Sequence, residues 1–139
     1  MKQKNMSEEN DFYDKNLFVK NSIKIDFLNN QKFLEKLGKV LFDLSSTKVF
    51  SAKLALGGKY HKNYYDFVKN GFLGENSSVL ELKSVKFRDF GETIKQNLCN
   101  YGIYFYSKRK KIYIKIFCGN GFLIEKTIQN YITKHIKNI

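Results

Sequence analysis

The chain has 139 residues, of which 42% are hydrophobic, and its formal net charge is +12. This length predicts a single domain that buries about two-thirds of its unfolded surface, and the apolar content excludes a chain that is disordered throughout. Only Arg88 and Arg109 of the 25 basic residues are arginine, and the chain has no proline and no tryptophan. Such a composition is typical of an AT-rich genome, so the positive charge alone is weak support for a polyanionic ligand.

Residues 1–15 are polar and of mixed charge, and we expect them to form a flexible tail ahead of one domain over residues 16–139. They lack the apolar centre of a signal peptide. No run elsewhere approaches the roughly 20 apolar residues of a membrane span. The sequence therefore predicts a cytoplasmic protein without a transmembrane segment.

The first half of the domain reads as strand, helix and strand. Residues 19–27 alternate between polar and apolar side chains, which predicts a strand. A helix should follow from Asn29 or Asn30 to about Ser45, because apolar residues recur at helical spacing. Residues 49–56 alternate again and predict a second strand. Residues 59–74 fit a strand or a short helix equally well.

The second half begins with a predicted strand over residues 79–87. Asp89 followed by Glu92 matches a capping box at the start of a helix, which Gly102 would end. Two strands and a final helix capped by Asn120 should follow. Together these elements predict an α+β domain: a mainly antiparallel sheet with three helices packed on one face, and a C-terminal β-hairpin followed by a terminal helix.

Residues 102–118 carry the clearest pattern of the chain. A four-residue loop at 107–110 places the isoleucines of both strands on one face, and an odd change in loop length would mix the two faces. The other face then carries Tyr104, Tyr106, Lys111, Tyr113, Lys115 and Phe117. We call this set the tyrosine-lysine face.

The tyrosine-lysine face predicts a binding surface for nucleic acid. Aromatic rings stack on bases and cations meet phosphates. The rings would come from Tyr104, Tyr106, Tyr113 and Phe117, and the cations from Lys108, Arg109, Lys110, Lys111 and Lys115. Residues 102–139 also hold eight basic residues and one acidic residue. Alternatively, the tyrosines could pack beneath a helix of the same chain or dock a protein subunit.

The remaining motifs predict no cofactor, metal site or catalytic group. Cys99 and Cys118 lack zinc-ligand spacing. His61 lies near two tyrosines and Asp66, which suggests a small ribonuclease, but no second catalytic base accompanies it. His135 fits a helix end. The sequence thus favours a small basic nucleic-acid-binding protein for RNA or single strands. The alternatives are a non-enzymatic assembly or protein-interaction protein, for which a relation to phages or plasmids is one option, and, third, a small ribonuclease.

Overall fold

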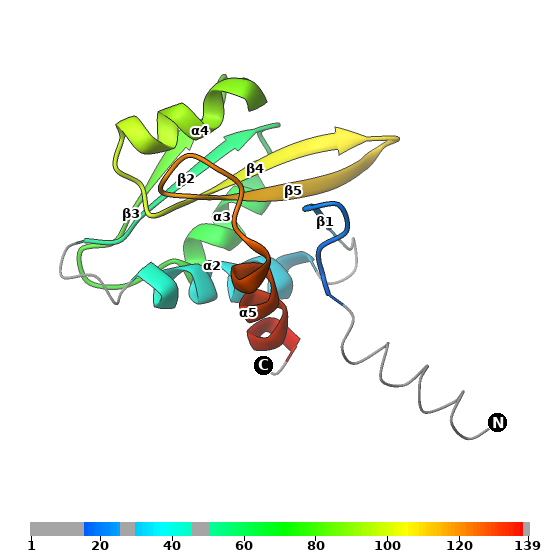
Figure 1. The fold of residues 1–139 in the computed structure, drawn as a ribbon, viewed down its shortest axis with the longest axis horizontal. Helices are drawn as coiled ribbons and strands as arrows, with labels where there is room; N and C mark the ends of the chain where they lie inside the picture. The colour runs from blue at the N-terminus through cyan, green and yellow to red at the C-terminus, as the bar shows by residue number, and fades with distance from the viewer. Residues whose placement is uncertain (1–15, 26–29, 46–50, 138–139) are drawn as a thin grey trace.

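A five-stranded mixed sheet with helices on both faces forms the centre of the structure (Figure 1). The computed structural model describes residues 16–25, 30–45 and 51–137. The strands are β1 (Ile23–Lys24), β2 (Lys53–Gly58), β3 (Ser78–Leu82), β4 (Tyr101–Lys108) and β5 (Lys111–Cys118). The helices are α2 (Asn30–Ser45), α3 (Lys62–Gly71), α4 (Phe87–Gln96) and α5 (Lys126–Lys137). The expected tail at 1–15 lies outside the described residues.

The sheet has the order β1-β5-β4-β2-β3, with β2 parallel to both β3 and β4. The pairs β4–β5 and β1–β5 are antiparallel. The α+β class is confirmed, but the expectation of a mainly antiparallel sheet is wrong in part. The reason is the ambiguous segment 59–74, which forms α3. Parallel neighbours require crossover connections, and α3 and α4 supply them between β2, β3 and β4.

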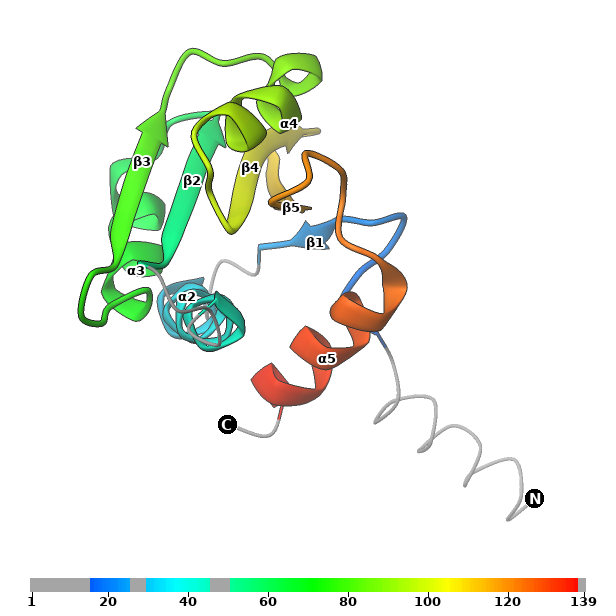
Figure 2. The same ribbon diagram turned by 60° about the vertical axis from the view of Figure 1, so that its left-hand side comes forward.

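The helices divide between the two faces of the sheet. Helices α2, α3 and α5 lie on one side and α4 lies alone on the other (Figures 1 and 2). The prediction of three helices on one face therefore has to be corrected to four helices in the described part of the chain, on two faces. The main core lies on the three-helix side, where Leu34, Leu37, Tyr65 and Ile103 are fully buried.

Helix α4 lies close to the sheet because the strand residues beneath it are small. A Cβ atom added at Gly57 would lie 2.5 Å from the Phe90 ring, and one at Gly102 would lie 2.3 Å from Ile94 Cδ1. Gly102 thus belongs to β4 and is not the predicted helix stop. The missing side chains let the apolar side of α4 approach the strands.

Several boundaries also differ from the prediction. Strand β3 ends at Leu82, and Lys86 occupies the N-cap of α4 without a side-chain hydrogen bond, so the Asp89 capping box does not form. Asn120 accepts a hydrogen bond from the Phe122 N–H in a turn, and α5 starts only at Lys126. In turns, side chains such as Asn120 bond nearby backbone N–H groups much as capping residues do at helix starts. Sequence patterns near residues 86 and 120 therefore misplace the start of the helix by a few residues.

The outer edge of β5 is covered by two segments distant from each other in sequence. Ile23 of β1 pairs with Ile114, and the Ile25 N–H donates to the Ile112 carbonyl at 2.9 Å. Farther along β5, the Ile124 N–H donates to Ile116 at 3.1 Å. None of the helices in the described ranges has the length and apolar character needed to cross a membrane.

Candidate nucleic-acid interface

The β4–β5 hairpin has a tighter turn than the sequence predicts. Lys108 pairs with Lys111, which leaves Arg109 and Lys110 as a two-residue turn. Both turn residues have positive φ, 53° and 66°, a combination that fits the turn type matching strand twist. The loop is thus two residues long instead of four. An even change keeps each side chain on its predicted face, so the two-faced hairpin is confirmed.

Helix α4 covers one end of the tyrosine-lysine face. The rings of Phe87 and Phe90 meet those of Tyr104 and Phe117 edge to face, with centroids 5.1 to 5.6 Å apart. The Tyr104 hydroxyl donates to the Val85 carbonyl at 3.3 Å, and burial raises the pKa of Tyr104. Tyr104 and Phe117 therefore belong to the packing of α4 against the sheet.

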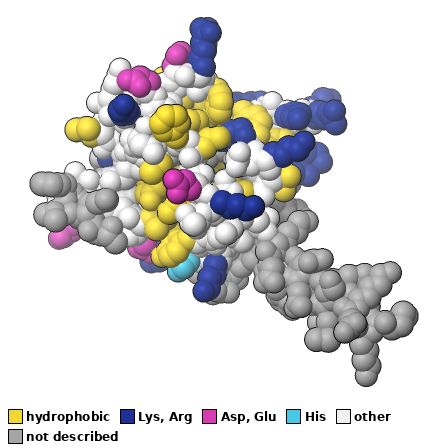
Figure 3. All heavy atoms as spheres, in the orientation of Figure 1, with side chains coloured by type: hydrophobic (Ala, Val, Ile, Leu, Met, Phe, Trp, Pro, Cys, Tyr) yellow, Lys and Arg dark blue, Asp and Glu magenta, His cyan; other side chains and the backbone are white. Residues whose placement is uncertain are grey.

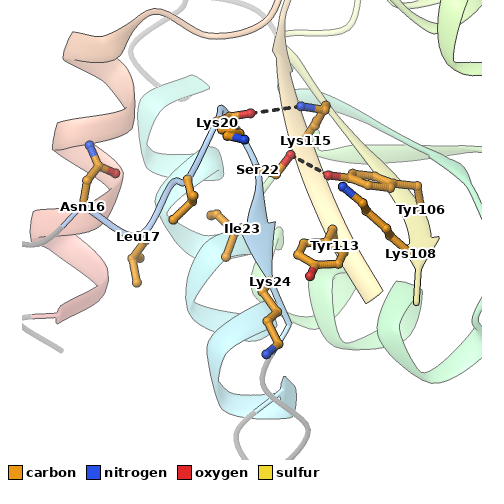
Figure 4. Close-up of a pocket in the computed structure, with 11 residues that line it drawn as sticks. Asn16, Leu17, Lys20, Ser22, Ile23, Lys24, Tyr106, Lys108, Tyr113 and Lys115 are labelled. Atoms are coloured by element: carbon orange, nitrogen blue, oxygen red, sulfur yellow. Dashed lines mark hydrogen bonds between the residues drawn. The ribbon is translucent and has the colours of Figure 1, made fainter. Parts of the chain in front are cut away.

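The other end of this face is open, and Tyr106 and Tyr113 lie there side by side (Figure 4). Their rings are nearly parallel, at 19°, with centroids 5.5 Å apart. The hydroxyls of Tyr106 and Ser22 are 2.7 Å apart and hydrogen-bonded. Lys115 Nζ donates to the Lys20 carbonyl at 3.2 Å. These contacts hold this end of the tyrosine-lysine face against residues 16–25, which we call the N-terminal segment.

The tyrosine pair and the N-terminal segment line a cavity of about 720 Å³, which we call the basic groove. Its lining consists of Asn16, Leu17, Val19, Lys20, Ser22, Ile23, Lys24, Tyr106, Lys108, Tyr113 and Lys115. Four of these residues are lysines and none is acidic. A groove of this composition can hold a polyanion, with apolar and aromatic surface for bases.

The lysines of the basic groove have no carboxylate partners among the described residues. The ion pairs found in ranges 16–25, 30–45 and 51–137 involve Lys62, Lys69 and Arg88, which lie elsewhere. Figure 3 shows lysine and arginine side chains gathered at the side of the molecule where the hairpin turn lies, with the acidic side chains elsewhere in that view. Within the described ranges, no ion pair with an acidic side chain neutralises the charge of the groove.

The other predicted cations divide between two places. Arg109 and Lys110 are exposed at the hairpin turn. Lys111 lies beside Lys24 of β1, and contact with the Lys24 amine together with its charge lowers the pKa of Lys111. Two ammonium groups brought together without an acid between them favour an added anion.

Sequence reasoning missed the contribution of the N-terminal segment to the groove. Lys20, Ser22 and Lys24 were not candidates, although Lys24 pairs with Tyr113 and faces the same side. The alternation in residues 19–27 correctly separated Ile23 from Lys24. It carried no signal for which strand this segment would pair with.

His61 does not form a catalytic group with Asp66. Its Nδ1 accepts a hydrogen bond from the Tyr64 N–H at 3.4 Å and caps α3, while its ring stacks on that of Tyr64. Asp66 instead pairs with Lys62 at 2.8 Å, which lowers the pKa of the carboxyl. His135 stacks on Tyr131 within α5. Both histidines thus contact residues of the helix that they cap or belong to, α3 for His61 and α5 for His135.

Within the described ranges, no group of three histidine, cysteine or acidic side chains is arranged to hold a metal ion. Cys99 and Cys118 are both free thiols, and burial raises the pKa of Cys99. No protein-family model matches this sequence. No curated protein matches it either.

Proposed function

We propose that the protein binds single-stranded nucleic acid in the basic groove. The observation that carries this proposal is the Tyr106–Tyr113 pair, which shares an open groove with four lysines and, among the described lining residues, no carboxylate. Bases of a single strand can be splayed onto aromatic rings, whereas the bases of a duplex remain stacked on each other. Lysines along the groove would meet the phosphates.

The proposal uses only part of the predicted surface. It relies on Tyr106, Tyr113, Lys108 and Lys115, and it adds Lys20, which precedes the edge strand β1, and Lys24, which belongs to it. Tyr104 and Phe117 are left out because α4 packs on them. Binding is expected to favour strands over duplexes and to weaken with salt.

The test compares two tyrosines, half-buried Tyr113 and exposed Tyr131. Tyr113→Leu removes a ring from the groove, and the control Tyr131→Leu removes one from α5, where Tyr131 is 39% exposed. Fluorescence anisotropy with labelled RNA and DNA strands of about 12 nucleotides measures the affinity. Loss of a stacking ring costs about 1–3 kcal/mol, so Tyr113→Leu should weaken binding roughly 5- to 150-fold and Tyr131→Leu should not.

Three results would contradict the proposal. One is a wild-type dissociation constant weaker than about 10⁻⁴ M at low salt, below ordinary non-specific binding. Another is an equal loss in the two tyrosine variants. The third is equal affinity for a strand and for the duplex of the same sequence. A molecular mass that rises with protein concentration, combined with no strand binding, would favour the assembly alternative instead.

A further inference from the structure

A second cavity, of about 690 Å³, lies next to the basic groove, and we call it the His61 cavity. Its lining consists of Lys24, Ile25, Lys59, His61, Tyr64, Lys110, Lys111 and Ile112. Like the groove, it has four lysines and no carboxylate among its described lining residues. Lys24 lines both cavities, so the two are neighbours on either side of Lys24, where β1 meets β5.

The position of the His61 cavity in the topology also suits a ligand. Strand β2 leads through α3 to β3 on one side, whereas its other neighbour β4 leads to β5 on the opposite side. Ligands of open sheets with parallel strands bind beyond the carboxyl ends of strands where the connections diverge in this way. Lys59 and His61 directly follow β2 at that point, with the Lys59 N–H bound to the Phe105 carbonyl at 2.8 Å.

The contacts of His61 leave it a hydrogen-bond donor. Because Nδ1 accepts from the Tyr64 N–H, the neutral imidazole carries its hydrogen on Nε2. The cavity therefore combines an N–H donor with the ammonium groups of Lys24, Lys59 and Lys111. Ammonium and N–H groups of this kind bind phosphate oxygens.

The closeness of Lys24 and Lys111 gives a second reason to expect an anion there. Their mutual contact disfavours two positive charges, which is why the pKa of Lys111 is lowered. No carboxylate of the described residues forms an ion pair with either amine. A phosphate between them would satisfy both.

We propose that the His61 cavity binds internal phosphates of the strand whose bases occupy the basic groove, so that the strand crosses the Lys24–Lys111 edge from one cavity into the other. This inference rests on the proposed function. It adds a path for the bound strand across the protein surface and a minimum strand length for full affinity. Short strands fill the groove only, and longer ones also reach Lys59 and Lys110.

The experiment compares strands of about 5 and about 12 nucleotides on the wild type and on Lys59→Gln/Lys110→Gln. Each lost phosphate contact reduces the slope of log affinity against log salt by about 0.7 for single strands. The variant should therefore lower the slope by about 1.4 for the long strand and leave the short strand unchanged. The control Lys95→Gln/Lys126→Gln removes the same charge from α4 and α5, outside both cavities, and should change neither slope.

A second variant tests the imidazole without removing the helix cap. Asparagine caps helices well, so His61→Asn should preserve α3 and the fold. Loss of one hydrogen bond is expected to weaken binding of the long strand about fivefold and to spare the short strand. Equal behaviour of His61→Asn and wild type on both strands would count against a phosphate contact from His61.

The outcomes separate this inference from the proposed function. If long-strand binding depends on Tyr113 but responds to Lys59→Gln/Lys110→Gln as it does to the control, only the strand path is overturned. If the wild type binds neither strand, both proposals fail. If a short strand with a 5′-phosphate binds as tightly as the long strand, the cavity takes a terminal phosphate, and the path of internal phosphates is wrong.

Discussion

The salt dependence of strand binding gives the most quantitative test of the basic groove. Lys20, Lys24, Lys108 and Lys115 line it, and a strand of about 5 nucleotides has enough phosphates to meet all four. At about 0.7 per contact, the slope of log affinity against log salt should be about −2.8. Raising the salt from about 50 to about 200 mM should then weaken binding by about 50-fold.

The double variant Lys24→Gln/Lys108→Gln should halve that slope. Two remaining contacts give a slope of about −1.4 and a loss of about sevenfold over the same salt range. Glutamine keeps most of the aliphatic stem, so packing along the strands is little changed. Both side chains are exposed, and the fold should be preserved.

Anisotropy titrations at several salt concentrations measure the slope directly. The control Lys95→Gln/Lys126→Gln has the same net charge as the variant, so it separates local contacts from the overall field of the protein. Parallel lines for the variant, the control and the wild type would refute the reasoning. They would mean that the groove lysines meet no phosphates.

Three further predictions concern stability. Gly91→Ala places a Cβ 2.0 Å from a carbonyl oxygen of the loop after β5 and should lower the free energy of unfolding by about 1–3 kcal/mol; an unchanged urea midpoint would contradict this contact. Arg109→Asn/Lys110→Gly suits the two positive-φ turn positions and should raise that free energy by about 1 kcal/mol, so a lower midpoint would argue against the turn. The Lys62 hydrogen bond lowers the pKa of Asp66, so its contribution is present above the unfolded carboxyl pKa of about 4 and is lost as pH falls through the lowered folded value. The difference in free energy of unfolding between wild type and Asp66→Asn should therefore shrink as the pH is lowered. A difference that grows in acid would contradict this reasoning.

The two-faced hairpin was predictable because period-two alternation fixes side-chain direction whatever the loop length, provided its parity holds. The turn length was not, since Arg109 and Lys110 lack the glycine that usually marks a two-residue turn. The mixed sheet was missed for a different reason. Residues 62–71 satisfy a helical and a strand pattern at once, and only their packing against α2 and the sheet decides between them.

The placement of α4 had a signal in the sequence that was overlooked. Along β2, the buried leucines Leu54 and Leu56 alternate with Ala55 and Gly57, so the second side of that strand is flat rather than polar. Flat strand surfaces admit a closely packed helix. The contribution of Lys24 to the groove had no such signal, because it depends on a pairing with Tyr113 across most of the chain.

The covered edge of β5 restricts how copies of this protein could associate. Growth of a sheet from one molecule to the next needs a strand whose outer hydrogen-bonding groups are unpaired. Along β5 those groups are bonded to β1 and to the segment ending at Ile124. Within the described sheet the margins are then β3 and the two-residue β1, so addition of a longer strand would use β3, at the opposite margin from the basic groove. Self-assembly by that route would leave the groove free for a ligand in every copy.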